Sequence, residues 1–290
     1  MTLRALYEVA APAKLNLFLH VVGRRADGYH LLQSLLVLID WCDTLHFELR
    51  HDAVLARRDL SAALPPDDLC LRAARALQAA SGTLLGADIS IDKQLPWGAG
   101  LGGGSSDAAS TLLALNRLWG LHWPRSRLLA LGLTLGADLP FFLGGRNAFV
   151  EGIGERLTPV PVPRQWLAVL KPAASIETHA IFASPLLVRN AAILESLSPN
   201  FEVGILRPGF GRNDLQRPAE AGCAQVAQAA AVLHKQFGNS RMTGSGSAVF
   251  ARAGTTDHPG TAMPEDLPPA WFGRMCRSLA EHPLVAWAED

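Results

Sequence analysis

The stretch that decides the fold runs from residue 95 to residue 107 and reads Leu95-Pro96-Trp97-Gly98-Ala99-Gly100-Leu101-Gly102-Gly103-Gly104-Ser105-Ser106-Asp107. Five of the seven residues from 98 to 104 are glycine, and an Ala- and Leu-rich pattern typical of a helix follows. Glycine permits a positive φ and lets a ligand approach the main chain closely. A glycine run that leads into a helix presents free backbone N–H groups beside the positive end of the helix dipole, an arrangement that binds phosphate. The stretch therefore predicts a site for nucleotide phosphates.

Other interpretations of the run compete with this one. A Walker loop ends in Gly-Lys-Ser/Thr, whereas this run ends Gly103-Gly104-Ser105 without a lysine, which excludes that loop. A Rossmann fingerprint can be spelled with Gly98, Gly100 and Gly103, but it needs an acidic residue about 20 residues further on, after a second strand. Residues 116–124 are instead typical of a helix end and a turn. A flexible linker would be polar, whereas the segments on both sides of the run are apolar.

The composition limits the classes of protein that the chain can belong to. Its 290 residues predict one large or two ordinary domains, and 49% of them are hydrophobic, which suffices for buried cores. The 26 Lys and Arg balance the 26 Asp and Glu, so no overall charge favours nucleic acid or an anionic membrane as a partner. No run approaches 18 consecutive apolar residues, and we expect no membrane span.

The cysteines indicate the compartment. Cys42, Cys70, Cys223 and Cys276 are far apart in sequence, with neither a CxxC pair nor zinc-finger spacing. They are typical of reduced thiols in the core of a cytosolic protein. The N-terminus lacks the apolar stretch of a signal peptide. We therefore expect a cytoplasmic protein, as a monomer or weak homodimer.

Alternation of apolar and polar residues predicts a half-buried strand over residues 13–22. One face would carry Leu15, Leu17, Leu19 and Val21, and the other Lys14, Asn16, Phe18 and His20. Asp27-Gly28 predicts a turn. Further strands are expected at residues 31–39, 44–50, 87–91, 146–151, 166–170 and 248–251.

One helix is expected from residue 65 to Gly82, because acidic residues mark its start and glycine marks its end. Others are expected at residues 105–119, 126–135, 219–237 and 271–280, with an exposed loop at residues 255–269. Alternating prolines at positions 159, 161 and 163 suit an extended crossing, and we place a domain boundary there, between residues 1–156 and 157–290. The mixture of hairpins and helices predicts an α+β fold.

Several polar residues are candidates for chemistry, each with a structural alternative. Lys14 and Asn16 are two apart on one strand, so both point the same way, toward an oxyanion or hydroxyl or simply toward solvent. Asp138 precedes Leu-Pro and is equally a helix N-cap. Ser105 and Ser106 open a helix, where a hydroxyl caps the backbone or reaches a phosphate or Mg²⁺, with Ser106 as the metal-side candidate.

The segment from residue 96 to 109, Pro-x-Gly-x-Gly-Leu-Gly-Gly-Gly-Ser-Ser-Asp-Ala-Ala, resembles the phosphate loop of the GHMP kinases, which include galactokinase, homoserine kinase and mevalonate kinase. It is most similar to the branch that phosphorylates 4-diphosphocytidyl-2-C-methyl-D-erythritol in the non-mevalonate route to isoprenoids, although Trp97 replaces the usual methionine. Ala-Lys-Leu-Asn-Leu at 13–17 and Thr-Gly-Ser-Gly at 243–246 resemble two further motifs of the family.

The resemblance covers nearly the whole chain. It implies an N-terminal domain like ribosomal protein S5 and a ferredoxin-like C-terminal domain. Residues 96–106 would bind ATP with its Mg²⁺, and the motif at 243–246 would pack beside them. Lys14 would lie near the acceptor hydroxyl, Asn16 would help to bind substrate, and Asp138 of Gly-Ala-Asp-x-Pro would be the general base. A neighbouring lysine keeps the pKa of a carboxylate low, so Asp138 would chiefly orient the hydroxyl.

Gly-Tyr-His at residues 28–30 favours the cytidyl branch. A Tyr-His pair beside a turn is often only surface, but in that branch the tyrosine stacks on cytosine and the histidine binds its polar edge. Thr178 and Phe182 would contact the same substrate, although Glu177 replaces a common proline. The expected activity is ATP-dependent phosphorylation of the 2-hydroxyl of this small cytidine diphosphate compound. The alternatives are a sibling small-molecule kinase of the mevalonate or homoserine type and a non-catalytic sensor of the same fold.

Overall fold

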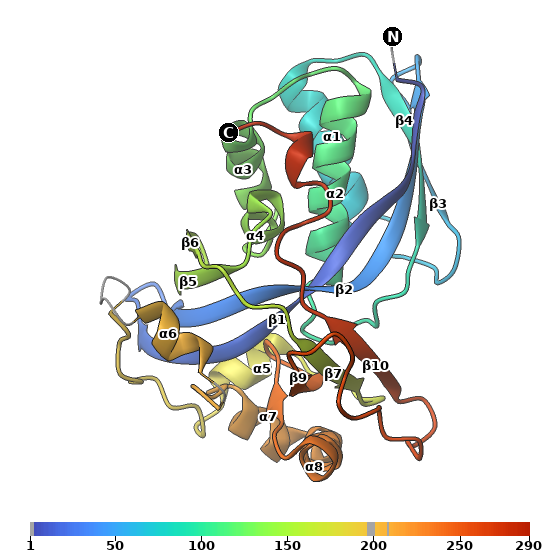
Figure 1. Ribbon diagram of the computed structural model, residues 1–290. Helices are drawn as coiled ribbons and strands as arrows, with labels where there is room; N and C mark the ends of the chain where they lie inside the picture. Colours follow the sequence, from blue (N-terminus) through green and yellow to red (C-terminus); the bar gives the residue numbers. More distant parts are fainter. Residues whose placement is uncertain (1–2, 196–200, 208) are drawn as a thin grey trace.

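The computed structural model describes residues 3–195, 201–207 and 209–290 (Figure 1). The first half of the chain forms β1 (Ala5–Arg24), β2 (His30–Arg50), β3 (Leu55–Asp59), α1 (Leu69–Ser81), β4 (Gly86–Asp92), α2 (Gly103–Leu118), α3 (Arg125–Leu133), α4 (Leu139–Gly144), β5 (Ala148–Gly152) and β6 (Arg156–Pro159). The second half forms β7 (Trp166–Lys171), α5 (Thr178–Ala183), α6 (Phe201–Leu206), α7 (Gln216–Gly222), α8 (Ala224–Phe237), β8 (Arg241–Met242), β9 (Val249–Gly254), β10 (Phe272–Arg277) and the 3-10 turn η1 (Val285–Trp287).

Two sheets organise these elements. The first has the order β3-β4-β2-β5-β6, with β1 paired antiparallel to β2 from Ala5 opposite Glu48 to Arg24 opposite His30. The second is antiparallel, with the order β10-β7-β9-β8. Figure 1 shows the long strands β1 and β2 running down from the first half to lie across the second half. These two strands therefore carry residues from the first sheet into the space between the halves.

Strand β1 departs from the predicted alternation. Its register on β2 shifts between Asn16 and Leu19, as at a β-bulge, which inserts an extra residue into one strand. Phe18 consequently packs with Leu17 in a core cluster, while Leu19 lines the same cavity as Asn16. The predicted face assignment of Phe18 and Leu19 was therefore wrong. The strand is also not half-buried, because Lys14 and Asn16 are each only 5% exposed between the two halves.

The helices of the first half cover one face of the sheet. Helix α1 begins after Asp68, whose side chain accepts from the backbone N–H groups of Cys70 and Leu71, and ends at Gly82 in the left-handed conformation. The Asp68 carboxylate also pairs with Arg57 at 2.6 Å. The end at Gly82 is confirmed, but the helix begins at Leu69 and not at residue 65, because Asp68 caps it from outside its first turn.

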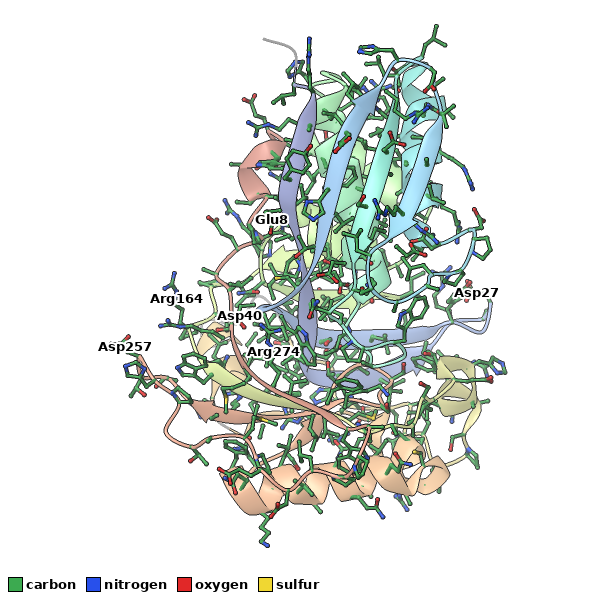
Figure 2. The ribbon with its side chains drawn as sticks, turned by 90° about the vertical axis from the view of Figure 1, so that its right-hand side faces the viewer. Glu8, Asp27, Asp40, Arg164, Asp257 and Arg274 are labelled. Carbon is green, nitrogen blue, oxygen red and sulfur yellow. The ribbon has the colours of Figure 1, made fainter. Side chains whose placement is uncertain are left out.

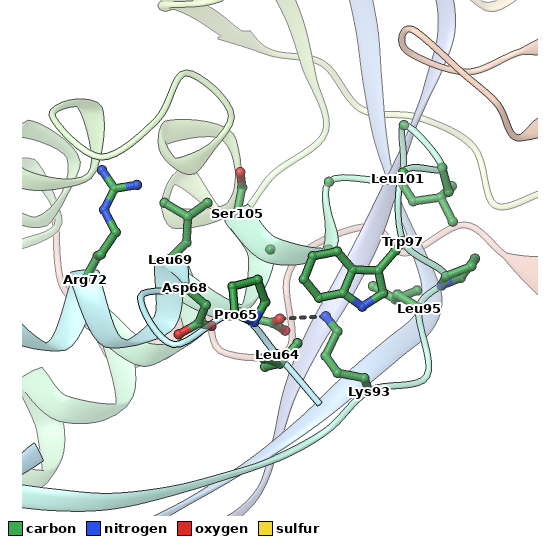
Figure 3. Close-up of a pocket in the computed structure, with 18 of the residues that line it drawn as sticks. Leu64, Pro65, Asp68, Leu69, Arg72, Lys93, Leu95, Trp97, Leu101 and Ser105 are labelled. Atoms are coloured by element: carbon green, nitrogen blue, oxygen red, sulfur yellow. Dashed lines mark hydrogen bonds and ion pairs between the residues drawn. The ribbon is translucent and has the colours of Figure 1, made fainter. Parts of the chain in front are cut away.

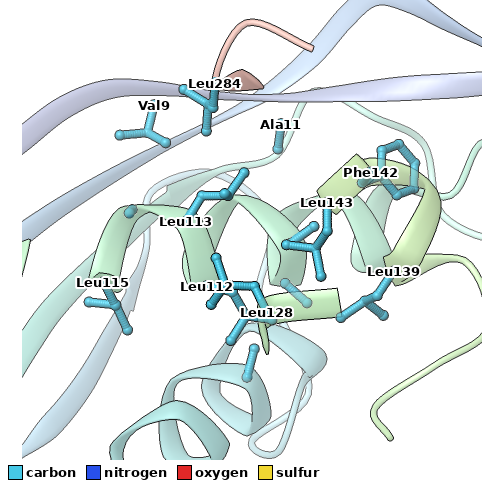
Figure 4. Close-up of a cluster of buried hydrophobic side chains, with 14 of the residues drawn as sticks. Val9, Ala11, Leu112, Leu113, Leu115, Leu128, Leu139, Phe142, Leu143 and Leu284 are labelled. Carbon is cyan, nitrogen blue, oxygen red and sulfur yellow. The ribbon is translucent and has the colours of Figure 1, made fainter. Parts of the chain in front are cut away.

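Helix α2 is the centre of the larger core. Leu112 and Leu113 are buried with Leu143 of α4 and Val9 of β1, and Leu284 from the C-terminal end joins them (Figure 4). Full burial of one such side chain is worth about 1.5–3 kcal/mol relative to exposure. This packing fixes the start of α2, and with it the glycine run, against the sheet.

Two predicted helices were wrong. The stretch from 219 to 237 is not one helix, because Cys223 takes an extended conformation and separates α7 from α8. The stretch from 271 to 280 is the edge strand β10, paired with β7 from Phe272 opposite Lys171 to Arg277 opposite Trp166. Pairing with a strand distant in sequence overrides local helix propensity there. The short strand β3 was not predicted.

The end of the chain returns to the first half. The backbone N–H of Leu279 donates to the carbonyl of Leu38, and Arg125 binds Asp290 at 2.6 Å. Strand β6 still pairs with β5 in the first sheet, so the chain passes to the second sheet only after Pro159. The division into residues 1–156 and 157–290 stays a prediction.

The remaining surface features are exposed loops. Figure 2 shows Asp27 at the tip of the β1–β2 hairpin, on the opposite side of the view from Asp257. Residues 255–271 form neither helix nor strand, as expected for the loop at 255–269. Within the described ranges, no helix has the length and apolar character needed to cross a membrane.

Candidate active site

The glycine run forms one wall of a cavity of about 420 Å³, here called the loop cavity (Figure 3). The opposite wall comes from the start of α1, with Pro65, Asp68 and Leu69. Pro96 and every residue from Trp97 to Ser105 line it, and the Trp97 side chain is 53% exposed at its rim. The cavity thus has apolar walls beside a strip of bare main chain.

The conformation of the run requires glycine. Gly98, Gly100 and Gly102 have φ values of 59°, 74° and 75°. A Cβ on Gly100 would lie 2.6 Å from the carbonyl oxygen of Thr243, and one on Gly102 would lie 2.9 Å from the Phe142 ring. Any other residue would therefore combine an unfavourable backbone with a steric clash.

The run ends in an uncapped helix. Gly102 is the N-cap of α2 and has no side chain to satisfy the first backbone N–H groups. The first intrahelical bond runs from the N–H of Ser106 to the carbonyl of Gly102. The N–H groups of residues 103–105 have no partner within a helix at this end. Free donors and the positive end of the dipole thus face the loop cavity, as predicted.

The glycine turn of the second half holds the run in place. The N–H groups of Ser247 and Ala248 donate to the carbonyls of Gly98 and Ala99, at 3.2 and 3.1 Å. The N–H of Lys14 donates to the carbonyl of Leu101 at 2.9 Å. A Cβ on Gly100 would lie 2.6 Å from the carbonyl oxygen of Thr243 and 3.1 Å from that of Gly246, so the motif at 243–246 packs against the glycine run as predicted.

A buried charged cluster forms the floor of the loop cavity. The Lys93 ammonium contacts Asp43 and lies 2.6 Å from Asp107. Burial lowers the pKa of Lys93, but the two carboxylates outweigh it and hold that pKa above its usual value. Burial raises the pKa of the Asp107 carboxyl, against the opposing effect of Lys93. The cavity floor therefore does not present a full unpaired negative charge to an anion.

The two serines after the run have different surroundings. The Ser106 hydroxyl is fully buried and donates to the carbonyl of Pro12 at 2.7 Å, and Ser106 does not line the loop cavity. Ser105 does line it. This placement does not favour the metal-side role predicted for Ser106, because its hydroxyl is fully buried and lies outside the loop cavity.

A second cavity of about 350 Å³, here called the central cavity, lies on the other side of the run and shares Gly98, Gly100 and Gly102 with the loop cavity. Lys14 and Asp138 both line it. Burial lowers the pKa of the Lys14 ammonium, and the negative charge of Asp138 opposes that effect. A cation and a carboxylate thus face one space beside the glycines.

Asp138 occupies the position before α4, but its side chain makes no capping hydrogen bond. Asp138 therefore stands at the N-cap position, but its carboxylate does not cap the helix. Lys14 and Asn16 do point the same way, since the Lys14 ammonium donates to Oδ1 of Asn16 at 2.7 Å.

A third cavity of about 580 Å³, here called the hairpin cavity, lies under the tip of the β1–β2 hairpin. Tyr29 and His30 line it, and Tyr29 is 61% exposed. The His30 ring stacks on Phe182 with centroids 4.9 Å apart. Burial and the positive charges of Arg189 and Arg24 lower the pKa of His30.

The hairpin cavity and the central cavity share Leu32, Ile153 and Phe182, so the three cavities adjoin one another in a row, here called the groove. The Thr178 hydroxyl lies 2.7 Å from that of Ser245 at the edge of the central cavity. The structure thus brings together along one groove every predicted site residue except Ser106.

Sequence reasoning missed several residues of the groove. Lys93 stands close before the glycine run and is the only Lys or Arg between Arg75 and Arg117, which was a usable signal. Arg189 contacts His30 across 159 positions of sequence, and no local pattern could indicate that contact.

Comparison with known proteins identifies the family of the chain. Residues 68–146 match the model of the GHMP kinases N terminal domain. A 4-diphosphocytidyl-2-C-methyl-D-erythritol kinase of Methylibium petroleiphilum is 67% identical over 99% of this chain and 100% of its own length. One of Albidiferax ferrireducens is 53% identical over 99% of this chain and 96% of its own length.

Solved structures give the same result for the fold. A crystal structure of 4-(cytidine 5'-diphospho)-2C-methyl-D-erythritol kinase has a TM-score of 0.72 and 31% identity, and covers 93% of this chain and 98% of its own. A homoserine kinase from Cytophaga hutchinsonii shares the fold, with a TM-score of 0.67 at 15% identity over 97% of this chain and 96% of its own. The expected α+β GHMP architecture is confirmed. The chain belongs to the GHMP kinases and, within them, to the family of the 4-diphosphocytidyl-2-C-methyl-D-erythritol kinases.

Proposed function

We propose that this protein transfers the γ-phosphoryl group of ATP to the 2-hydroxyl of 4-diphosphocytidyl-2-C-methyl-D-erythritol. The groove of adjoining cavities carries this proposal, because its three cavities match the three parts of such a reaction. A nucleotide fits the loop cavity, an alcohol the central cavity and a cytidine the hairpin cavity. The names of the full-length relatives support the same substrate.

The triphosphate would lie on the backbone of residues 96–105. The free N–H groups at the start of α2 and the helix dipole stabilise its negative charge. Mg²⁺ usually keeps several waters and binds mainly through substrate phosphates. No group of three or more His, Cys, Asp or Glu in the described part of the chain could hold a metal by itself, so Mg²⁺ would reach the site on ATP, beside the Ser105 hydroxyl.

The acceptor hydroxyl would lie between Lys14 and Asp138 in the central cavity. Asp138 accepts the proton of this hydroxyl as its oxygen attacks the γ-phosphorus, and the Lys14 ammonium offsets the charge of the transferring group. Asn16 holds the ammonium in place through its side-chain oxygen. Positioning and charge stabilisation dominate phosphoryl transfer, so the main contribution of Asp138 would be to orient the hydroxyl.

The cytidine would lie in the hairpin cavity. Tyr29 and Phe182 are the aromatic rings available for stacking on the base, and His30 offers a ring nitrogen to its edge. Thr178, at the start of α5, would bind the chain between base and alcohol from the edge of the central cavity. The substrate would thereby span two cavities and reach the phosphate loop with its hydroxyl.

The test is ADP release by the purified protein with ATP, Mg²⁺ and a panel of alcohols. We expect turnover of 4-diphosphocytidyl-2-C-methyl-D-erythritol, with the new phosphate on the 2-hydroxyl by ³¹P NMR. Turnover of mevalonate or homoserine alone would replace the substrate assignment by a sibling kinase. Nucleotide binding without turnover of any alcohol would indicate a sensor.

All four cysteines are free thiols, which supports the proposed cytoplasmic location.

A further inference from the structure

Arg189 ties the hairpin cavity to the segment that follows α5. Its Nη2 donates to the carbonyls of Phe182 and Ser184 at 2.9 and 3.1 Å, and its Nη1 donates to the carbonyl of Leu187 at 3.0 Å. Its Nε donates to Nε2 of His30 at 3.0 Å. One guanidinium therefore fixes both the aromatic Phe182 and the ring that stacks on it, from opposite halves of the chain.

The contact with His30 decides where that ring carries its proton. A guanidinium has five N–H donors and no acceptor, so the Nε2 atom of His30 must offer a lone pair. A neutral imidazole with an unprotonated Nε2 carries its proton on Nδ1. Nδ1 of His30 has no hydrogen-bond partner among the residues at 3–195, 201–207 and 209–290. His30 lines the hairpin cavity, and its protonated Nδ1 can therefore donate a hydrogen bond to a ligand there but cannot accept one.

A donor in this place distinguishes two pyrimidines. The polar edge of cytosine offers acceptors at N3 and O2 beside its amino group. Uracil instead carries a proton on N3. The Nδ1–H group of His30 would face this N–H and would be left without an acceptor. An unmatched polar group of this kind costs about 1–3 kcal/mol, which is roughly a 5- to 150-fold difference in affinity.

We propose that Arg189 is a positioning residue that sets the base selectivity of the hairpin cavity: it occupies the acceptor nitrogen of His30, so the cavity takes cytosine and rejects uracil. This inference rests on the proposed function only in placing the base in this cavity. Arg189 itself touches His30 and the backbone of the second half, and not the reacting groups.

The test combines a spectroscopic and a binding measurement. The ¹⁵N shifts of the His30 ring at pH 7 report its tautomer, and we expect the Nδ1–H form in the unmodified protein. Calorimetry with CDP and UDP, with the loop cavity saturated by a non-hydrolysable ATP analogue, gives the selectivity. We expect CDP to bind at least 10-fold more tightly than UDP, within the range set by one unmatched donor.

Arg189→Met should reduce this ratio to less than about 3-fold and release the tautomer, because no donor then holds Nε2. Arg189→Lys keeps a donor and should retain part of the ratio, which also covers the case in which the methionine variant does not fold. Arg164→Met removes the same charge from an exposed position far from the groove and should leave the ratio unchanged.

An Nε2–H tautomer in the unmodified protein would overturn the proposal. Equal weakening of CDP and UDP by Arg189→Met would also overturn it, since that result describes a purely structural role. Failure of CDP to bind would do the same. These readouts need no turnover. A protein that selects CDP in this way but phosphorylates no cytidyl alcohol would therefore refute the proposed function and leave this inference intact.

Discussion

The ammonium of Lys14 donates a 2.7 Å hydrogen bond to Oδ1 of Asn16, two residues along β1. The amide of Asn16 cannot turn over, because its Nδ2 donates to the Ser34 hydroxyl, which in turn donates to the carbonyl of Phe18. A chain of hydrogen bonds from the backbone thus sets the direction of the buried cation. This preorganisation is what electrostatic stabilisation of a transferring group requires.

Replacing Lys14 by methionine should lower kcat by about 10²–10³-fold, the usual effect of removing one preorganised donor. Methionine has a similar length and fills the buried space, so folding should be retained. Titration with ADP should show nearly unchanged affinity, since the loop cavity does not include this side chain. Lys235→Met, on the exposed side of α8, is the control. A kcat of Lys14→Met within 5-fold of the unmodified protein would contradict the assigned role.

The glycine run should tolerate a methyl group at one position and not at another. Gly100→Ala should destabilise the protein by about 2 kcal/mol or more, because its φ is 74° and its Cβ would meet the backbone of Thr243 at 2.6 Å. Gly104→Ala lies in α2, where the new Cβ would meet only Leu69 at 3.8 Å. That change should leave stability equal or raise it by up to about 1 kcal/mol. Urea unfolding of both variants measures this, and an equal loss in both would refute the steric explanation.

Arg125 holds the C-terminal end of the chain on the first half. Its guanidinium donates to the carbonyls of Leu143, Val285 and Ala288, besides its contact with Asp290. Arg125→Met should cost about 3 kcal/mol or more, because buried carbonyls lose their donors. Asp290 is largely exposed, so Asp290→Asn should cost at most about 1 kcal/mol. Thermal unfolding compares the two, and similar melting temperatures would show that the carbonyl contacts do not matter.

Stability should depend on pH through His282. This ring is buried beside Arg125, and burial followed by that positive charge lowers its pKa to about 4. Since the unfolded chain binds a proton near pH 6.5, it takes up more protons than the folded chain between pH 6.5 and 4. Stability from this residue is therefore complete above pH 6.5 and is lost as the pH falls toward 4, by about 2–3 kcal/mol.

The matched control for this titration is His282→Asn, whose side-chain oxygen can still accept from the backbone N–H of Leu284, as Nδ1 of His282 does. Chemical unfolding at pH 7 and pH 4.5 should show a smaller decrease in the free energy of unfolding for the variant. If both proteins lost stability equally over this range, the contribution of His282 would be refuted.

Local signals predicted the elements with strong ends. Helix α1 could be predicted because Asp68 and Gly82 mark its ends in the sequence, and the glycine run before α2 announces its own conformation. The identity of the groove residues Lys14 and Asp138 came from short motifs. In each of these cases, residues that are neighbours in the sequence determine the feature.

Long-range pairing escaped prediction. Strand β10 exists because β7, about 100 residues earlier, offers it an edge, and the bulge after Asn16 depends on the register with β2. Arg189 also acts through a contact with a residue distant in sequence, His30. Tertiary contacts override local propensity at such positions, and only the folded structure reveals them.

We propose that a phosphoryl group passes from the glycine run to a hydroxyl held between Lys14 and Asp138. The most direct test is kcat of Asp138→Asn with ATP and 4-diphosphocytidyl-2-C-methyl-D-erythritol, measured beside the dissociation constant for ADP. Asparagine keeps the shape and removes the proton acceptor, so we expect kcat to fall by about 10²–10⁴-fold while ADP affinity stays within a factor of about three. Near-complete turnover by this variant would contradict the claim.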